Sequence, residues 1–290
     1  MGPPIRDRLR PSASVSPYDA GVSSPRLLFS TAAFFARPLS ETFGIIAETG
    51  YTGVEVMVTK DPASQDPRRM RGLADAHGLT IGAIHAPCLL LTRRVWGTDP
   101  VGKIYRAIEV AEEAGAPIVV VHPPYRWQRA YRRWLEDRLP GLSATTGVTV
   151  AVENMFPLRV GGRQVTFHAN QDLDELEGLP NLVFDTSHAA VAEHDLVAVR
   201  RRFDGRIRHV HLSDNAGKGW DSHLPPGEGV LPLDAFLDDL TASGFRGSVA
   251  LEVDLRTSLT DPTRLRRTMS SMRERVEQRL APGAKTLEAG

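Results

Sequence analysis

The sequence predicts an α/β protein folded as a single (β/α)8 barrel. Short, β-branched apolar runs alternate with helical segments, and eight such pairs fit between residues 26 and 281. These runs are hydrophobic almost throughout, which is typical of parallel strands covered on both faces. After the first run the chain reads STAAFFARP, without the glycine-rich phosphate loop of a doubly wound open sheet. Together these observations favour a TIM barrel over the open sheet.

Each strand is predicted from an apolar run and each helix from a periodic segment with start and stop signals. In the first unit, Ser40 is the expected N-cap and Gly50 the expected stop; in a later helix, Ile104 and Ile108 share one apolar face. The strands are expected at residues 27–34, 53–58, 80–86, 117–122, 147–153, 181–185, 207–213 and 247–253. The helices are expected at residues 39–50, 66–78, 99–116, 127–139, 170–179, 192–202, 232–244 and 261–280.

The chain ends and the composition narrow the class of protein. Residues 1–25 are rich in Pro, Ser and Arg and lack the apolar core of a secretory signal, so we expect a disordered extension before the barrel of residues 26–281. Residues 282–290 are expected to form a flexible tail. The formal net charge is +0, which provides no global attraction to nucleic acid or membrane. A single cysteine, Cys88, excludes an internal disulfide and fits a cytoplasmic protein.

Six predicted strands in succession carry a residue that can bind a metal at their end or within two residues of it. In a parallel barrel, strand ends gather at one mouth, where active sites lie. Any one of these residues is more often a buried histidine or a capping carboxylate, but packing alone does not explain the whole row. Imidazoles mixed with carboxylates suit Zn, Mn, Co or Fe, so the pattern predicts a metalloenzyme. The strand-ending residues are His85, His122, Glu153, Asp185, His211 and Glu252, and His188, Asp221 and His223 follow in the adjoining loops.

Several short motifs resemble the xylose isomerase-like barrel superfamily, which contains sugar isomerases and epimerases and the endonuclease IV type of DNA repair enzyme. The motifs are VENM, FDTSH, HVHLSDN, DSHLPPGEG and LEV, and the resemblance spans residues 27–255. It implies a single Mn or Co site at Glu153, Asp185, His211 and Glu252. In the endonuclease branch, the matching residues bind three zinc ions. There Glu153 would bridge the first ion, on His85 and His122, to the second, and His188, Asp221 and His223 would hold the third.

Two chemistries therefore remain open. The first is a metal-dependent isomerase or epimerase of a sugar, sugar phosphate or polyol, in which Glu153 and Glu252 transfer a proton as acid and base. The second is a multi-zinc phosphodiester hydrolase of the AP endonuclease type. The first-strand region and Glu55 resemble the isomerase branch, and the loop after His85 lacks the tyrosine expected in the nuclease branch. A sugar-derived dehydratase or lyase is a further alternative.

The expected partner is a small carbohydrate involved in carbohydrate metabolism, with nucleic acid only under the hydrolase alternative and no membrane. Expected substrate contacts are Glu55 after the second strand, Arg93 and Arg94 after the third, and Lys218 in the loop after His211. The number of metal ions, from one to three, and a homo-oligomeric state are left open. Trp127 lies at the start of the predicted helix 127–139, where its spacing to Tyr131 predicts an aromatic packing stripe.

Overall fold

The computed structural model describes residues 25–88, 92–142, 144–161 and 163–281. Apart from Pro25, the predicted N-terminal extension lies outside these ranges, as does the predicted tail. No helix within the described ranges combines the length and the apolar character needed to cross a bilayer.

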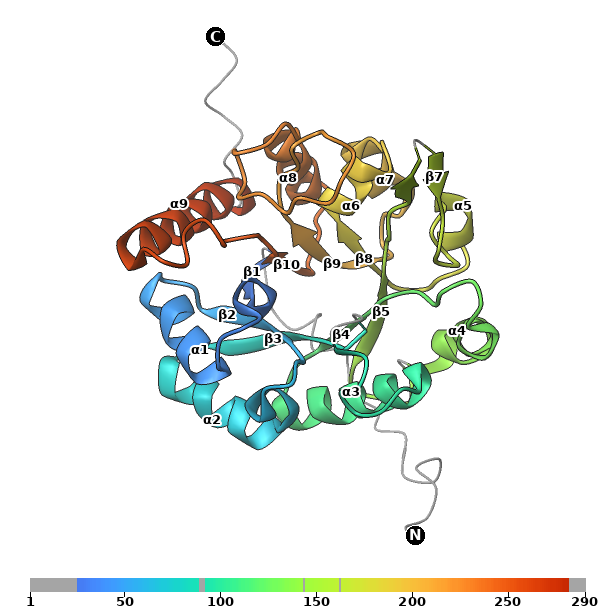
Figure 1. Ribbon diagram of the computed structural model, residues 1–290, viewed down its shortest axis with the longest axis horizontal. Coiled ribbons are helices and arrows are strands. Elements are labelled where there is room, and N and C mark those ends of the chain that lie inside the picture. Colours follow the sequence, from blue (N-terminus) through green and yellow to red (C-terminus); the bar gives the residue numbers. More distant parts are fainter. Residues whose placement is uncertain (1–24, 89–91, 143, 162, 282–290) are drawn as a thin grey trace.

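Eight parallel strands close into a barrel, which confirms the predicted (β/α)8 fold. Going around the barrel, neighbouring strands follow the order β1, β10, β9, β8, β5, β4, β3 and β2, and β2 pairs with β1 to complete the circle. Figure 1 shows the helices arranged as a ring around these strands. The barrel strands are β1 (Arg26–Ser30), β2 (Gly53–Met57), β3 (Thr80–His85), β4 (Ile118–Val121), β5 (Thr149–Glu153), β8 (Leu182–Asp185), β9 (Ile207–Leu212) and β10 (Ser248–Leu251).

The helices begin and end at recognisable signals. Three of them start at an Asp-Pro pair, in which the aspartate accepts hydrogen bonds from the first turn and the proline occupies the first helical position. Gly78 and Gly115 take the left-handed conformation that ends a helix. The helices are α1 (Leu39–Glu48), α2 (Pro67–His77), α3 (Pro100–Ala114), α4 (Arg129–Leu142), α5 (Leu173–Leu176), α6 (Thr186–Val191), α7 (Leu196–Arg202), α8 (Leu233–Ala242) and α9 (Pro262–Leu280).

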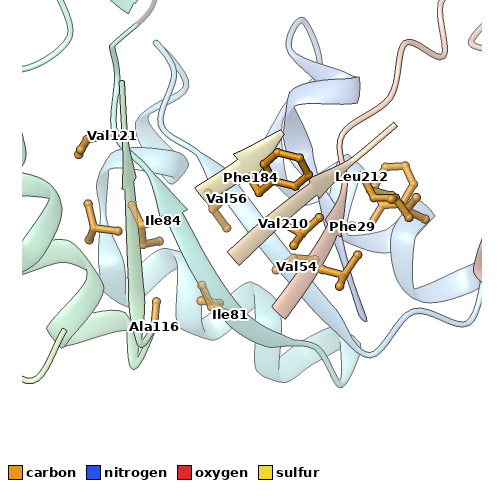
Figure 2. Packing of buried hydrophobic residues seen from close by; sticks show 14 of the residues in the cluster. Phe29, Val54, Val56, Ile81, Ile84, Ala116, Val121, Phe184, Val210 and Leu212 are labelled. Carbon is orange, nitrogen blue, oxygen red and sulfur yellow. The ribbon is translucent and has the colours of Figure 1, made fainter. Parts of the chain in front are cut away.

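The core has two separate layers. Large apolar side chains such as Phe29, Phe184 and Leu212 pack between the strands and the surrounding helices (Figure 2). Inside the barrel a smaller cluster, including Leu28 and Ala83, fills the lower part. Because side chains alternate along a strand, every second residue points into the barrel, and the last inward position of each strand reaches the mouth. This alternation determines which polar residues meet at the mouth.

Five local features differ from the sequence-based expectation. The first strand ends at Ser30, whose side chain accepts a hydrogen bond from Ala32 N and starts a 3-10 helix. Helix α1 begins at Leu39 after Pro38, so Ser40 is not its N-cap. Helix α4 begins at Arg129, which leaves Trp127 exposed in the preceding loop and outside the predicted stripe. The antiparallel hairpin of β6 (Leu158–Val160) and β7 (Arg163–Val165) and the short helix α6 were not expected.

Candidate metal centre

Glu153, at the end of β5, lies at the centre of the mouth. Its Oε2 is 3.1 Å from Nε2 of His122 and 3.6 Å from Nε2 of His85. Its Oε1 is 3.1 Å from Nδ1 of His211 and 3.3 Å from Nδ1 of His188. The side chain is almost fully buried. One carboxylate therefore contacts imidazoles from four different segments.

A second group of potential ligands surrounds Nδ1 of His211. This atom is 2.8 Å from Oε2 of Glu252 and 3.8 Å from Oδ2 of Asp185. The register of β8 and β9 places Asp185 directly beside His211, and Glu252 follows β10 on the other side of β9. Ligand atoms of Glu153, Asp185, His211 and Glu252 all lie within 4.8 Å of one another, as a single cation requires.

The remaining predicted ligands adjoin these two groups. His85, His122 and Glu153 form one further set, and Asp185, His188 and His223 form another. The expected third site contained Asp221 in place of Asp185. Asp221 lies close by, with Oδ2 at 2.8 Å from Nε2 of His223. The structure therefore brings all nine predicted ligands together, and Glu153 and Asp185 each belong to two sets.

Most of these histidines use one ring nitrogen for a hydrogen bond, leaving the other for the centre. Nδ1 of His85 donates to the carbonyl oxygen of Ala86, and Nδ1 of His188 donates to that of Asn154. Nδ1 of His223 lies 3.1 Å from the carbonyl oxygen of Glu252. Metal-binding histidines usually show this arrangement because the second hydrogen bond determines the tautomer and the ring orientation.

Glu55, which lies deeper in the barrel than the proposed ligands, orients His211 through a hydrogen bond. Its Oε2 accepts hydrogen bonds from Nε2 of His211 at 3.0 Å and from Nε2 of His209 at 2.8 Å, while its Oε1 accepts one from Ser30. Ser248 Oγ is 2.7 Å from Nδ1 of His209. Glu55 is fully buried, so it lies beneath the centre rather than along a substrate pocket, where the sequence placed it. This relay leaves Nδ1 of His211 facing the carboxylates.

The electrostatics of the cluster follow from its burial and from the close contact of its carboxylates with imidazoles. Burial alone would raise the pKa of Glu153, but the imidazoles of His211 and His122 outweigh this and hold it well below its usual value. Burial lowers the pKa of His211, yet the carboxylates of Glu55 and Glu252 raise it well above the usual value. Burial raises the pKa of Asp185 above its usual value. The cluster therefore requires positive charge near these carboxylates.

Three carboxylate oxygens show where that charge fits. Oε2 of Glu153, Oδ2 of Asp185 and Oε2 of Glu252 are buried and make no hydrogen bond of acceptable geometry within the described residues, although the two glutamate oxygens lie beside imidazole nitrogens. Buried acceptors without a partner are rare and costly in folded proteins. Because all three belong to the same four-residue group, the donor set fits a divalent cation bound by oxygen and imidazole ligands.

The family assignment agrees with this geometry. The sequence pattern of the family described as xylose isomerase-like TIM barrel matches residues 43–275. The chain belongs to this family. The resemblance read from the short motifs is therefore confirmed.

Relatives of known sequence or structure extend the comparison. An uncharacterized protein of Mycobacterium tuberculosis (strain ATCC 25618 / H37Rv) is 38% identical over 243 residues, covering 77% of this chain and 87% of its own. A D-tagatose 3-epimerase-like protein has a similar crystal structure, with a TM-score of 0.64 at 23% identity, over 88% of this chain and 100% of that one. A family 2 AP endonuclease from Brucella melitensis superposes with a TM-score of 0.61 at 19% identity, covering 82% of this chain and 99% of that one.

The predicted substrate contacts lie in different places. Arg93 lines a cavity of about 300 Å3 beside His122. Arg94 and Lys218 are exposed and do not line that cavity or the one on the opposite side of the centre. That second cavity, of about 450 Å3, is bordered by His223 and Glu252. In this member of the xylose isomerase-like family, the centre thus opens on two sides.

Residues that support the centre were missed by the sequence-based reasoning. Asp214 is buried, and its carboxylate accepts hydrogen bonds from the backbone N–H groups of Asn215, Gly227 and Leu231. It thereby closes the loop that carries Asp221 and His223. The sequence contained one indication that Asp214 is important, because this aspartate belongs to the HVHLSDN motif and follows His211 closely.

Two other side chains and a strained backbone help to place the ligands. Asn154 links β5 to β8 through hydrogen bonds to both backbone groups of Asp185. Ser187 donates to Oδ1 of Asp221 at 2.6 Å. His223 has a φ of 41°, in the left-handed region that non-glycine residues seldom adopt.

We expect Asp214→Asn to loosen the loop of residues 215–231. The new amide presents donors where backbone N–H groups need acceptors, so local opening should become easier by about 1–3 kcal/mol. Hydrogen exchange at the amides of Gly227 and Leu231 measures the change. Glu228→Gln, which makes the same chemical change at an exposed position of the same loop, should leave exchange unaltered. Equal exchange in the two variants would remove the anchoring role of Asp214.

Proposed function

We propose that this protein is a metal-dependent isomerase or epimerase acting on a ketose. The observation that supports this function is the group of Glu153, Asp185, His211 and Glu252, whose ligand atoms lie within 4.8 Å of one another. Three of its carboxylate oxygens are buried without a hydrogen-bond partner. The D-tagatose 3-epimerase-like structure and a fructoselysine 3-epimerase of Shigella flexneri, 21% identical over 241 residues, agree with the proposal.

In this mechanism the protein holds a ketose at the mouth and moves one proton. A divalent cation held by the four residues would supply Lewis-acid polarisation of the carbonyl and its neighbouring hydroxyl, which acidifies the adjoining C–H bond. Glu153 on β5 and Glu252 after β10 approach the same point from either side of β8 and β9. One carboxylate removes the C–H proton, and the charge left on carbon spreads into the carbonyl. The other residue, protonated as a carboxylic acid, donates its proton to the opposite face and becomes a carboxylate, which inverts the carbon while the first residue keeps the proton it removed.

The first test is proton exchange with solvent. Wild-type protein should exchange one carbon-bound proton of a suitable ketose for deuterium, detected by NMR, because the proposed carbanion is reprotonated from a carboxylate in contact with water. Glu153→Gln cannot carry the proton and should reduce the exchange rate by at least about 100-fold. Glu228→Gln, away from the centre, is the control. Exchange that persists undiminished in Glu153→Gln would exclude the proposed role of this carboxylate.

Glu55 provides a second test, because it acts on metal affinity through His211. Glu55→Gln keeps the shape of the side chain but removes the charge that accepts both histidine hydrogen bonds. We expect zinc or manganese affinity to fall by about 10- to 100-fold, measured by competition with a chelating dye. Circular dichroism of the variant checks that the barrel is intact. An unchanged affinity in a folded variant would show that the hydrogen bond to His211 does not tune the centre.

A second function is favoured by one specific observation. Eight of the nine predicted ligands form adjoining sets in which Glu153 and Asp185 are shared. A single-cation epimerase does not need the sets containing His85, His122, His188 and His223. Several cations held side by side can neutralise the charge of a phosphoryl group and activate water. The multi-metal phosphoester hydrolase therefore remains the alternative, and the AP endonuclease structure agrees with it.

Metal stoichiometry separates the two functions. Protein purified without added metal should contain about one divalent ion per chain if the isomerase is correct, measured by elemental analysis alongside the protein concentration. A content near three ions, reduced by His188→Ala, together with nicking of an abasic-site duplex, would favour the hydrolase instead.

A further inference from the structure

The cavity beside His122 is a part of the mouth that no proposed ligand set explains. It measures about 300 Å3 and extends from His122 toward the start of α3, between the loops after β3 and β4. This volume is at the lower end of the range for small-molecule pockets, so it suits a compact metabolite. A molecule that reaches the carboxylates of the centre would place its far end in this cavity.

The charge of this cavity is positive. Among the described residues, its lining includes Arg93 and Lys103 and contains no aspartate or glutamate. Within the described residues, neither cation forms an ion pair with a carboxylate. His168, which also lines the cavity, stays uncharged at neutral pH because burial lowers its pKa to about 4.

Lys103 is an unusual component of this lining, because its side chain is buried while its charge is not neutralised. Only 6% of the residue is exposed, and its Nζ donates to the carbonyl oxygens of Pro87, Thr92 and Arg93 at 2.9–3.1 Å. These hydrogen bonds satisfy the donors and hold the loop after β3, but a carbonyl dipole does not cancel a full charge. A buried cation near a cavity therefore attracts an anion that enters it.

In the cavity on the opposite side of the centre, the arginines are neutralised by carboxylates. Arg256, which lines it, donates to both carboxylate oxygens of Asp254 at 2.8–3.0 Å, and Arg37 is paired with Glu41. Within the part of the chain that the structure describes, the guanidinium of Arg93 has no such carboxylate partner, so it is available to a ligand anion. A planar guanidinium binds phosphate or carboxylate through paired donors.

The other wall of the cavity is aromatic. Tyr125 stacks on Trp127, with centroids 4.7 Å apart, and on His168 at 4.4 Å. The loops that carry them are joined by backbone hydrogen bonds from Arg126 to Phe167 and from Ala169 to Pro124. Such a surface can pack against the apolar face of a sugar ring or chain between its two polar ends.

We propose that the substrate carries an anionic group, either a phosphate or a carboxylate, which Arg93 binds in the cavity beside His122 under the field of Lys103. This inference rests on the proposed function and specifies its substrate as an acidic ketose. The ketose oxygens face Glu153 and Glu252, the carbon chain lies along Tyr125, and the anion is at the far end.

Calorimetric titration of the metal-loaded protein tests the subsite. The ligands are fructose, fructose 6-phosphate, a keto sugar acid and inorganic phosphate, and the proteins are wild type, Arg93→Ala and Arg94→Ala. We expect at least one of the two anionic sugars to bind about 10- to 100-fold more tightly than fructose, as charge-assisted hydrogen bonds allow. Arg93→Ala should abolish that preference and Arg94→Ala, an exposed arginine outside the cavity, should keep it. Whichever anionic sugar shows the preference identifies the group.

The outcomes separate this inference from the proposed function. Fructose binding as tightly as both anionic sugars, or equal losses in the two arginine variants, would overturn the anion subsite even if proton exchange is observed. In a further outcome, inorganic phosphate binds in an Arg93-dependent manner while no ketose exchanges a proton with solvent. That result would support the anion subsite and refute the proposed isomerase function. Absence of any Arg93-dependent anion binding would refute the subsite.

Discussion

The structure around the mouth depends on the burial of several carboxylates in one small volume, where only nearby positive charge can stabilise their ionised form. Glu153, Asp185 and Glu252 place oxygen atoms without hydrogen-bond partners in one small volume, with His211 beside them. In a medium of low polarity, such a group is stable only with added positive charge, from protons or from a cation. The pKa of His211 is raised and that of Glu153 is lowered for the same reason, because each group is stabilised in its charged form by the opposite charge beside it.

A second layer of residues keeps the ligands in a geometry that a cation can use. Glu55 binds the far nitrogen of His211, and backbone carbonyl groups bind those of His85 and His188. Asp214 holds the loop that carries Asp221 and His223, because its carboxylate accepts hydrogen bonds from three backbone N–H groups. Since rotation of a ligand side chain is restricted in advance, binding requires little further ordering.

The two cavities beside the centre differ in charge and polarity. The cavity beside His122 combines unneutralised cations with an aromatic wall, whereas the one beside Glu252 has paired arginines and a mainly apolar lining that includes Phe34 and Leu259. An acidic ketose bound across the centre would therefore have one preferred orientation. That orientation would also determine which carbon faces Glu153 and Glu252, so the cavity would contribute to the choice of the reacting C–H bond.

The amino-acid sequence was sufficient to predict the barrel and the row of ligands near the strand ends, because parallel strands with a two-residue period leave few alternatives for where His85 or Asp185 can point. It also indicated the family through motifs such as VENM. It misplaced Glu55, because pattern alone does not reveal how deep in the barrel an inward residue lies. The three-dimensional contacts were needed to show that Asp185 adjoins His188 and His223, and that Asp214 anchors the loop carrying Asp221 and His223. They also showed that Arg93, rather than Arg94, lines the cavity beside His122. These contacts join segments far apart in the chain through loop conformations, which no local period specifies.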